Sequence, residues 1–373
     1  MKIVIDSKIP FINGIFEPFA DVVYKAGTEI SNADLTDADA LVIRTRTVCN
    51  AKMLENTGVK LIASATVGFD HIDADFCSRN NIAWTNAAGC NSLAVAQYVL
   101  AALLQISLKC NIKPEKTTTG IIGVGNVGKK VENICRSLGM NVLLCDAPRK
   151  KNENNTSFAD IVETVENADI VTLHVPLNYD GEYKTFHLFD TEMFEMMKAK
   201  ILINTSRGEI IETGALKSAI THRKIDFTVI DVWENEPEID KNLLSLVDIA
   251  TPHIAGYSLE GKAAGTEMAV RAVSKFFNFG LDNWQVNLPE IEKQIIIDCT
   301  DKSTVRILQD AVKQIYDITC DSDLLKCDAD GFETMRSAYG LRREFAARKI
   351  FAKNINEKQK KILNLLNFNL IKS

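Results

Sequence analysis

The stretch Ile121-Ile-Gly-Val-Gly-Asn-Val-Gly128 decides the fold expected for this chain. Two apolar residues end a predicted strand, and three glycines with the spacing GxGxxG lead into a predicted helix from Val127 to Leu138. Gly123 permits a tight turn, Gly125 lets backbone approach a diphosphate, and Gly128 lets helix and strand pack closely. Unpaired N–H groups at the helix start favour an anion. The stretch therefore predicts a dinucleotide-binding turn.

The next predicted strand, Val142–Cys145, ends at Asp146. A carboxylate at this position binds the ribose hydroxyls of an adenosine and repels a 2′-phosphate, so it favours NAD over NADP. The alternative is an ordinary aspartate at the end of a strand. Arg149 lies close by and is the one residue that weakens the preference for NAD.

Short apolar runs alternate with helical patterns along most of the chain, which predicts doubly wound parallel sheets. Strands are expected in the first part at Ile3–Ile5, Ala40–Ile43 and Leu61–Ala65, and after the glycine turn at Ile170–His174, Ile201–Asn204, Phe227–Asp231 and Asp248–Ala250. Long helices are expected from Leu93 to about Leu108 and from Leu259 to Phe277. The second of these could return the chain to the first domain and close a cleft between two domains.

We expect three domains within the α/β class: a discontinuous substrate domain (1–92 and 257–286), a Rossmann-like domain (93–256) and a small α+β C-terminal domain (287–373). The C-terminal part shows a strand pattern at Gln294–Asp298 and helical patterns at 302–316 and 336–351. Its tail is basic. We interpret that charge as a solvated helical face, and the alternative is that Arg342 and Arg343 help to hold an anionic substrate across a subunit interface.

Composition excludes several classes of function. The 373 residues are 46% hydrophobic and 25% charged, as in ordinary globular proteins. The net charge of −6 argues against nucleic acid as the main partner. Nine cysteines without CxxC spacing predict no metal knuckle and fit a reducing cytoplasm. The N-terminus reads as a strand, and no membrane span is expected.

Three groups at predicted strand ends carry the expected chemistry. Arg207 lies in Asn204-Thr-Ser-Arg-Gly208, and a guanidinium there can hold a carboxylate with two hydrogen bonds. His253 lies in Thr251-Pro-His-Ile-Ala-Gly256, and an unperturbed imidazole titrates near about pH 6.5, which suits proton transfer. Asp231-Val-Trp-Glu-Asn-Glu-Pro237 offers Glu234 and Glu236 as alternative partners for a histidine. Asp231 itself could reach the nicotinamide side of a cofactor.

Taken together, these motifs resemble the D-2-hydroxyacid dehydrogenase family over nearly the whole chain. The resemblance implies NAD-dependent oxidation of a small phosphorylated 2-hydroxy acid, with Arg207 binding substrate, His253 carrying the proton and Glu236, which directly precedes a proline, supporting His253. It implies cofactor contacts from a further set of residues: Gly123, Gly125, Asn126, Val127, Gly128, Asp146, Ser206, Asp231 and Gly256. Thr45, Thr66 and Tyr257 match substrate-binding positions, and Arg44 and Arg46 are candidates for the substrate phosphate.

The resemblance also implies that the C-terminal domain forms a homodimer. Val175 departs from the family pattern, because a hydroxyl residue is expected there near the cofactor. Two other functions stay open: oxidation of a different D-2-hydroxy acid, and an NAD-sensing corepressor or scaffold that keeps the fold for binding partners.

Overall fold

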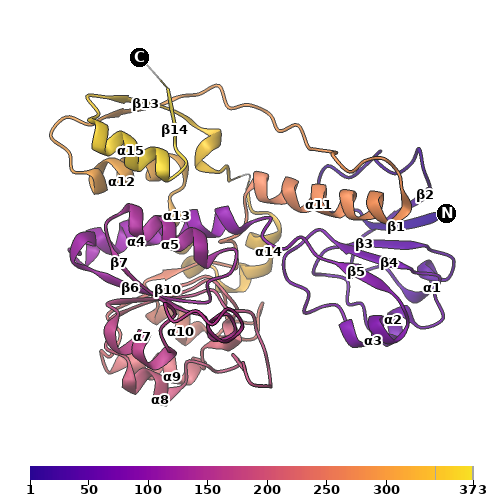
Figure 1. Ribbon diagram of the computed structural model, residues 1–373, viewed down its shortest axis with the longest axis horizontal. Coiled ribbons are helices and arrows are strands. Elements are labelled where there is room, and N and C mark those ends of the chain that lie inside the picture. Colours follow the sequence, from indigo (N-terminus) through magenta and orange to yellow (C-terminus); the bar gives the residue numbers. More distant parts are fainter. Residues whose placement is uncertain (341, 372–373) are drawn as a thin grey trace. The chain divides into compact units, whose positions relative to one another are not determined.

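The computed structural model describes residues 1–340 and 342–371 (Figure 1). They form two compact units. The first holds Met1–Asn91 with Ser258–Pro289, and the second holds Ser92–Tyr257 with Glu290–Ser373. The three domains expected from the sequence stay a prediction. The C-terminal segment, expected as a domain of its own, groups with the second unit.

The first unit is a parallel sheet of five strands in the order β2-β1-β3-β4-β5. Its strands are β1 (Lys2–Asp6), β2 (Asp21–Lys25), β3 (Ala40–Ile43), β4 (Leu61–Ser64) and β5 (Ala83–Thr85). Its helices are α1 (Asn32–Leu35), α2 (Ala51–Leu54), α3 (Ala74–Arg79) and α11 (Leu259–Phe277). The predicted strands are confirmed, and α11 has the bounds read from the sequence.

The strand period of two explains how this sheet is covered on both faces. In β1, Ile3 and Ile5 pack in one cluster with Val270 of α11, while Val4 packs in another with Leu35 of α1. Neighbouring side chains of a strand point to opposite faces, so a continuous apolar run buries both. That is why these strands show no polar alternation.

The second unit contains a parallel sheet of six strands in the order β11-β10-β9-β8-β6-β7. The strands are β6 (Thr118–Ile122), β7 (Asn141–Cys145), β8 (Ile170–Leu173), β9 (Ile201–Asn204), β10 (Phe227–Ile230) and β11 (Ile249–Ala250). The helices before and between them are α4 (Ser92–Lys109), α5 (Gly128–Ser137), α6 (Ala147–Asn152), α7 (Ile161–Asn167), α8 (Thr191–Met196), α9 (Thr213–Thr221) and α10 (Lys241–Leu246), with short 3₁₀ turns at Pro114–Lys116 and Gly208–Ile210. The strand order reverses between β6 and β8, which is where ligands bind in such sheets.

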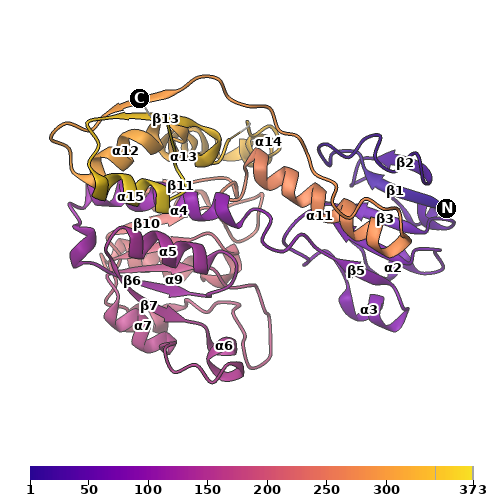
Figure 2. The ribbon, with the colours of Figure 1, turned by 45° about the horizontal axis from the view of Figure 1, so that its top comes forward.

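Helix α4 is the apolar centre of this unit. It lies against one face of the sheet with α5, while α7 to α10 cover the other face (Figures 1 and 2). Its length and mean hydropathy would suit a membrane span, but 72% of it is buried inside the protein. Burial of this kind is typical of a core helix.

The C-terminal segment adds a third parallel sheet, β12-β13-β14. Its elements are β12 (Ile295–Asp298), α12 (Thr304–Ile315), α13 (Ile318–Cys327), a 3₁₀ turn (Ala329–Gly331), α14 (Phe332–Ser337), a second 3₁₀ turn (Phe345–Ala347), β13 (Lys349–Lys353), α15 (Glu357–Leu365) and β14 (Asn369–Ile371). The helix predicted over 336–351 is wrong: apart from residue 341, which lies outside the described residues, the stretch ends α14 and enters β13. Ile350 is fully buried in the middle strand, so tertiary pairing overrides the local helical pattern.

This segment packs onto the core of the second unit. Gln309 of α12 donates from Nε2 to the carbonyl of Leu104 in α4 at 3.2 Å. In α13, Ser322 accepts from the N–H of Ala250 at 3.1 Å, and Lys326 donates to the carbonyl of Asp248 at 3.0 Å. Helix α13 thus covers the edge strand β11, whose free backbone groups would otherwise face water.

Candidate active site

The glycine turn has the geometry that a bound diphosphate needs. Gly123 has a φ of +89°, and a Cβ there would lie 2.5 Å from the carbonyl oxygen of His174. A Cβ on Gly128 would lie 2.0 Å from the carbonyl oxygen of Gly123, so only glycine fits. A Cβ on Gly125 would meet nothing within 4 Å. Gly125 and Asn126 are exposed, and Val127 precedes the first residue of α5, so the turn offers open backbone at a helix start.

Asp146 lies directly beside this turn. Its Oδ2 accepts from the N–H of Val124 at 2.8 Å, and its Oδ1 caps α6 by accepting from the N–H of Arg149 at 3.1 Å. The guanidinium of Arg149 pairs with Glu153 at 2.7 Å and donates to the carbonyl of Val124 at 2.8 Å. Glu153 balances the charge of Arg149. Arg149 therefore argues less against NAD than its position in the sequence suggested.

A neutral histidine lines the reversal point of the sheet. The ring nitrogens of His174 lie 3.0 Å from the hydroxyl of Thr172 and 3.2 Å from that of Thr205. Burial lowers the pKa of His174 to about 3, so the ring is uncharged at neutral pH. The neighbouring Val175 packs against the core, and a Cβ on Gly123 would come within 2.8 Å of its backbone nitrogen. Any contact of residue 175 with a cofactor would therefore come from backbone.

Ser206 has a buried hydroxyl oxygen with no hydrogen-bond partner among the residues that the structure describes. Its N–H donates to the side chain of Asn204 at 3.0 Å, and the same side chain donates to the carbonyl of Arg207 at 3.0 Å. Buried hydroxyl groups normally make a hydrogen bond, so this hydroxyl is suited to bond with a ligand.

The structure brings Glu236 and His253 together. Glu236 Oε2 lies 2.7 Å from His253 Nδ1, and its Oε1 accepts from the N–H of Trp233 at 2.9 Å. Burial would raise the pKa of Glu236, but His253, the Trp233 N–H and the nearby Arg336 outweigh it and hold that pKa below its usual value. Because the carboxylate engages Nδ1, Nε2 carries the lone pair that can accept a proton.

Asp231 holds the loop that presents His253. Its buried carboxylate accepts from the Thr251 hydroxyl at 2.6 Å and from the N–H groups of Ile254 at 2.8 Å and Ala255 at 2.9 Å. These bonds support a φ of +55° at His253, a conformation that a residue with a side chain adopts at a cost. Burial raises the pKa of Asp231 despite these contacts. The contact of Asp231 with a cofactor stays a prediction, since the structure shows it anchoring the loop.

Arg207 follows β9, next to β10 in the sheet. A Cβ on Gly208 would lie 1.9 Å from the carbonyl carbon of Trp233, so the backbone of Arg207-Gly208 is pressed against the loop that carries Glu236. The guanidinium donates to the carbonyl of Ser206 at 2.8 Å. Gly256 and Tyr257 follow the histidine loop, and both are partly buried.

A second histidine–glutamate pair settles the choice between the two glutamates. Glu234 lies 2.7 Å from His187 Nε2 and accepts from the N–H of Thr213 at 2.8 Å. Glu234 is therefore engaged with His187, and Glu236 alone of the two bonds to His253.

The substrate candidates of the first unit follow two neighbouring strands. Arg44 pairs through Nε with the fully buried Asp6 at 2.9 Å, so much of its donor capacity serves the fold. Thr45 and Arg46 are exposed after the end of β3. Thr66, after β4, shares a hydrogen bond of 2.9 Å with the hydroxyl of Ser64.

Sequence reasoning missed Arg336 of α14, whose Nη1 lies 3.9 Å from Glu236 Oε2. Nothing local signals it, because the two residues are far apart in the chain. Arg342 does not lie on a solvated face: its buried guanidinium donates to the carbonyls of Ala94 and Ala255 within its own chain and lies over the ring of Tyr316 at 4.5 Å. The alternative that Arg342 and Arg343 hold a substrate across a subunit interface stays a prediction.

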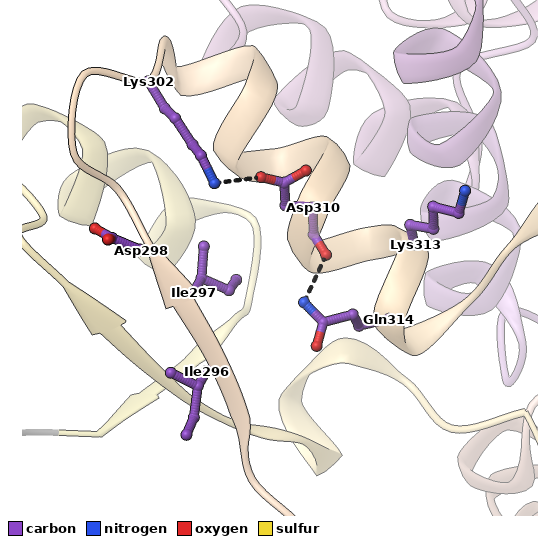
Figure 3. A pocket seen from close by; sticks show the side chains of 7 residues that line it. All are labelled: Ile296, Ile297, Asp298, Lys302, Asp310, Lys313 and Gln314. Carbon is purple, nitrogen blue, oxygen red and sulfur yellow. Dashed lines mark hydrogen bonds and ion pairs between the residues drawn. The ribbon is translucent and has the colours of Figure 1, made fainter.

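A surface pocket between β12 and α12 contains none of the candidate active-site residues (Figure 3). Its charged Lys302 and Asp310 pair with each other at 2.8 Å. That pairing leaves no uncompensated charge between them to select an ionic ligand.

Comparison with known proteins identifies the family. The chain is 46% identical to the erythronate-4-phosphate dehydrogenase of Bacteroides thetaiotaomicron over 92% of this chain and 97% of that protein. The chain belongs to the erythronate-4-phosphate dehydrogenases. It is also 39% identical to the protein of that name from Acinetobacter baumannii, over 93% of this chain and 98% of the relative.

Two family models match parts of the chain. Residues 106–255 match the NAD-binding domain of D-isomer specific 2-hydroxyacid dehydrogenases, and residues 288–366 match a domain of unknown function. The fold resembles D-lactate dehydrogenase of Aquifex aeolicus complexed with NAD and lactic acid (TM-score 0.62, 23% identity, 78% of this chain and 100% of that one). It also resembles NAD⁺-bound 3-phosphoglycerate dehydrogenase of Entamoeba histolytica (TM-score 0.63, 25% identity, 77% and 99%).

As a member of this family, the protein is an NAD-dependent oxidoreductase with a Rossmann-like domain. The predicted family, fold class and cofactor are confirmed. The individual roles of the site residues stay predictions, and the geometry above is most favourable to those of Glu236 and His253.

Proposed function

We propose that this protein oxidises 4-phospho-D-erythronate to 2-oxo-3-hydroxy-4-phosphobutanoate with NAD, a step in the synthesis of pyridoxine 5′-phosphate. The observation that carries the proposal is the 2.7 Å contact between Glu236 and His253 Nδ1, which leaves Nε2 to act as a base. The names of the relatives supply the substrate.

The residues divide the work as follows. His253 Nε2 accepts the proton of the C2 hydroxyl, and Glu236 stabilises the imidazolium that forms. Arg207 holds the substrate carboxylate and the C2 oxygen, on which the carbonyl develops. Bound NAD supplies the acceptor for the hydride that leaves C2.

The glycine turn would hold the diphosphate of NAD, with Asp146 at the adenosine ribose and the unpaired hydroxyl of Ser206 available to the cofactor. Thr45, Thr66 and Tyr257 would contact the substrate. Of the two arginines near Thr45, Arg46 is the more exposed and is our preferred candidate for the phosphate.

We further propose that the enzyme works as a homodimer formed by the C-terminal segment, in the cytoplasm. Nine unpaired cysteines suit a reducing compartment. Light scattering of the purified protein tests the dimer, and a monomer at micromolar concentration would refute it.

A turnover panel tests the reaction. NADH formation is measured with 4-phosphoerythronate, glycerate and 3-phosphoglycerate, each with NAD and with NADP. We expect the highest kcat/KM for 4-phosphoerythronate with NAD. A preference for another acid would replace the substrate, a preference for NADP would refute the role of Asp146, and absence of turnover together with NAD-dependent partner binding would favour a corepressor.

A further inference from the structure

Arg336 is a cation placed beside the carboxylate that supports the proposed base. Its Nη1 lies 3.9 Å from Glu236 Oε2, the same oxygen that engages His253 at 2.7 Å. Its guanidinium carbon lies 6.0 Å from the centre of the Tyr257 ring. Only 17% of its side chain is exposed, and its Nε has no hydrogen-bond partner among the described residues. A buried cation so close to a buried carboxylate interacts with it strongly.

The segment that carries Arg336 is fixed on both sides. Before it, Phe332 is buried in the core beneath the sheet. After it, the Tyr339 hydroxyl donates to Asp321 at 2.7 Å, and Arg342 donates to the carbonyl of Ala255 in the histidine loop. Arg336 is therefore held against Glu236 by packing at several points.

Before the reaction His253 must be neutral, so its charge cannot then balance Glu236. Burial would raise the pKa of Glu236, and Arg336 is one of the groups that hold it down. Burial likewise works to lower the pKa of Arg336, but Tyr257 and Glu236 outweigh it. Each of the two charges thus favours the ionised form of the other.

We propose that Arg336 is a positioning residue that keeps Glu236 ionised while His253 is neutral and so weakens the binding of a proton by the Glu236–His253 pair. The domain of unknown function at 288–366 thereby contributes to the chemistry of the site. The inference rests on the proposed role of His253 as the base.

Among the described residues, further charged and titratable groups that act on the pair or on Arg336 include Asp231, Tyr257 and Glu333. Glu333 is an acid that raises the pKa of Arg336, and Asp231 is an acid whose own pKa is lowered by His253 although burial raises it overall. Arg336 and a protonated His253 are cations that act on Glu236. Removing Arg336 therefore tightens proton binding by the pair, whichever of the two residues holds the proton.

The test compares Arg336→Gln, Arg336→Met and Arg336→Lys with wild type in the full-length enzyme. In wild type, kcat/KM should fall at low pH, because the pair must lose its proton before it can act as base; we call this fall the acidic limb. In Arg336→Gln and Arg336→Met the acidic limb should shift to higher pH by about one pH unit. Turnover should approach the wild-type value above the limb. Arg336→Lys should keep the limb near its original position. Methionine fills the site with apolar atoms if glutamine unfolds the protein.

Arg306→Gln is the matched control, because Arg306 also lies in the C-terminal segment and pairs with Asp310 at 3.3 Å on an exposed surface. It should leave the limb unchanged. If a folded neutral variant keeps the wild-type limb, or if Arg336→Lys moves it equally, Arg336 has only a structural role. NMR titration of the His253 ring in the protein without cofactor needs no turnover, so it tests the inference even if the proposed reaction fails.

Discussion

The two large sheets have similar strand orders. They differ in how the polar side chains at the carboxyl ends of their strands are held. In the second unit, Asp231 accepts three hydrogen bonds and Glu236 two, and these bonds position His253. In the first unit, the buried Asp6 holds Arg44, while Thr45 and Arg46 stay exposed. Proton transfer needs a fixed geometry, whereas a phosphate can be bound by adaptable surface cations.

Replacing His253 with alanine should have the largest effect. We expect kcat/KM to fall about 10²- to 10⁴-fold, because the general base is lost, while NAD affinity measured by fluorescence titration stays near wild type. His187→Ala is the matched control, since His187 makes the same 2.7 Å contact with a glutamate. Wild-type turnover in His253→Ala, or an equal loss in the control, would contradict the assignment of His253 as the base.

Substitutions of Gly125 and Gly128 should distinguish an effect on NAD binding from an effect on folding. Gly125→Ala should melt near the wild-type temperature but bind NAD at least about tenfold more weakly, because its Cβ would occupy space that is open in the protein and needed by the diphosphate. Gly128→Ala should lose stability, since its Cβ would lie 2.0 Å from a backbone oxygen. Thermal melting and NADH titration of both variants check this, and unchanged NAD affinity in Gly125→Ala would contradict the assignment of the turn.

The two arginines of the first unit should behave in opposite ways. Arg44→Gln should lower the free energy of unfolding by about 2 kcal/mol, because it leaves the buried Asp6 without its partner, although the 31% exposure of the arginine moderates the loss. Arg46→Gln should change stability by less than about 0.5 kcal/mol and raise KM for the phosphorylated substrate about tenfold. Denaturant titration and initial rates measure both, and the reverse pattern would assign the phosphate to Arg44.

Acid should weaken the second unit through His174. The folded pKa is about 3, below the ordinary value of 6.5, so the unfolded chain binds a proton that the folded protein excludes. Stability from this residue is complete above pH 6.5 and is lost as pH falls toward 3, by about 1 kcal/mol at pH 5.5. Denaturation at pH 7.5 and 5.5 should show a smaller acid loss in His174→Gln than in wild type. The exposed His222→Gln should keep the wild-type loss, and equal slopes in all three proteins would rule out His174.

Local patterns predicted most strands of the two large sheets, the glycine turn and the long helices, because each depends on residues close in sequence; the strands β2 and β5 were missed. They did not predict β13, since a short segment becomes the middle strand only when β12 and β14 pair with it. They left Glu234 and Glu236 as equal candidates until the resemblance favoured one. Only the fold could show that His187 engages Glu234.

The sequence by itself determined the class of the fold, the dinucleotide turn and the residue types that carry the chemistry, because glycine spacing and strand-end polar residues act through local backbone geometry. The tertiary structure decided which groups share a proton and which charges surround it. Arg336 and Glu236 lie a hundred residues apart in the chain, and no local pattern encodes a contact made by packing α14 against the loop after β10.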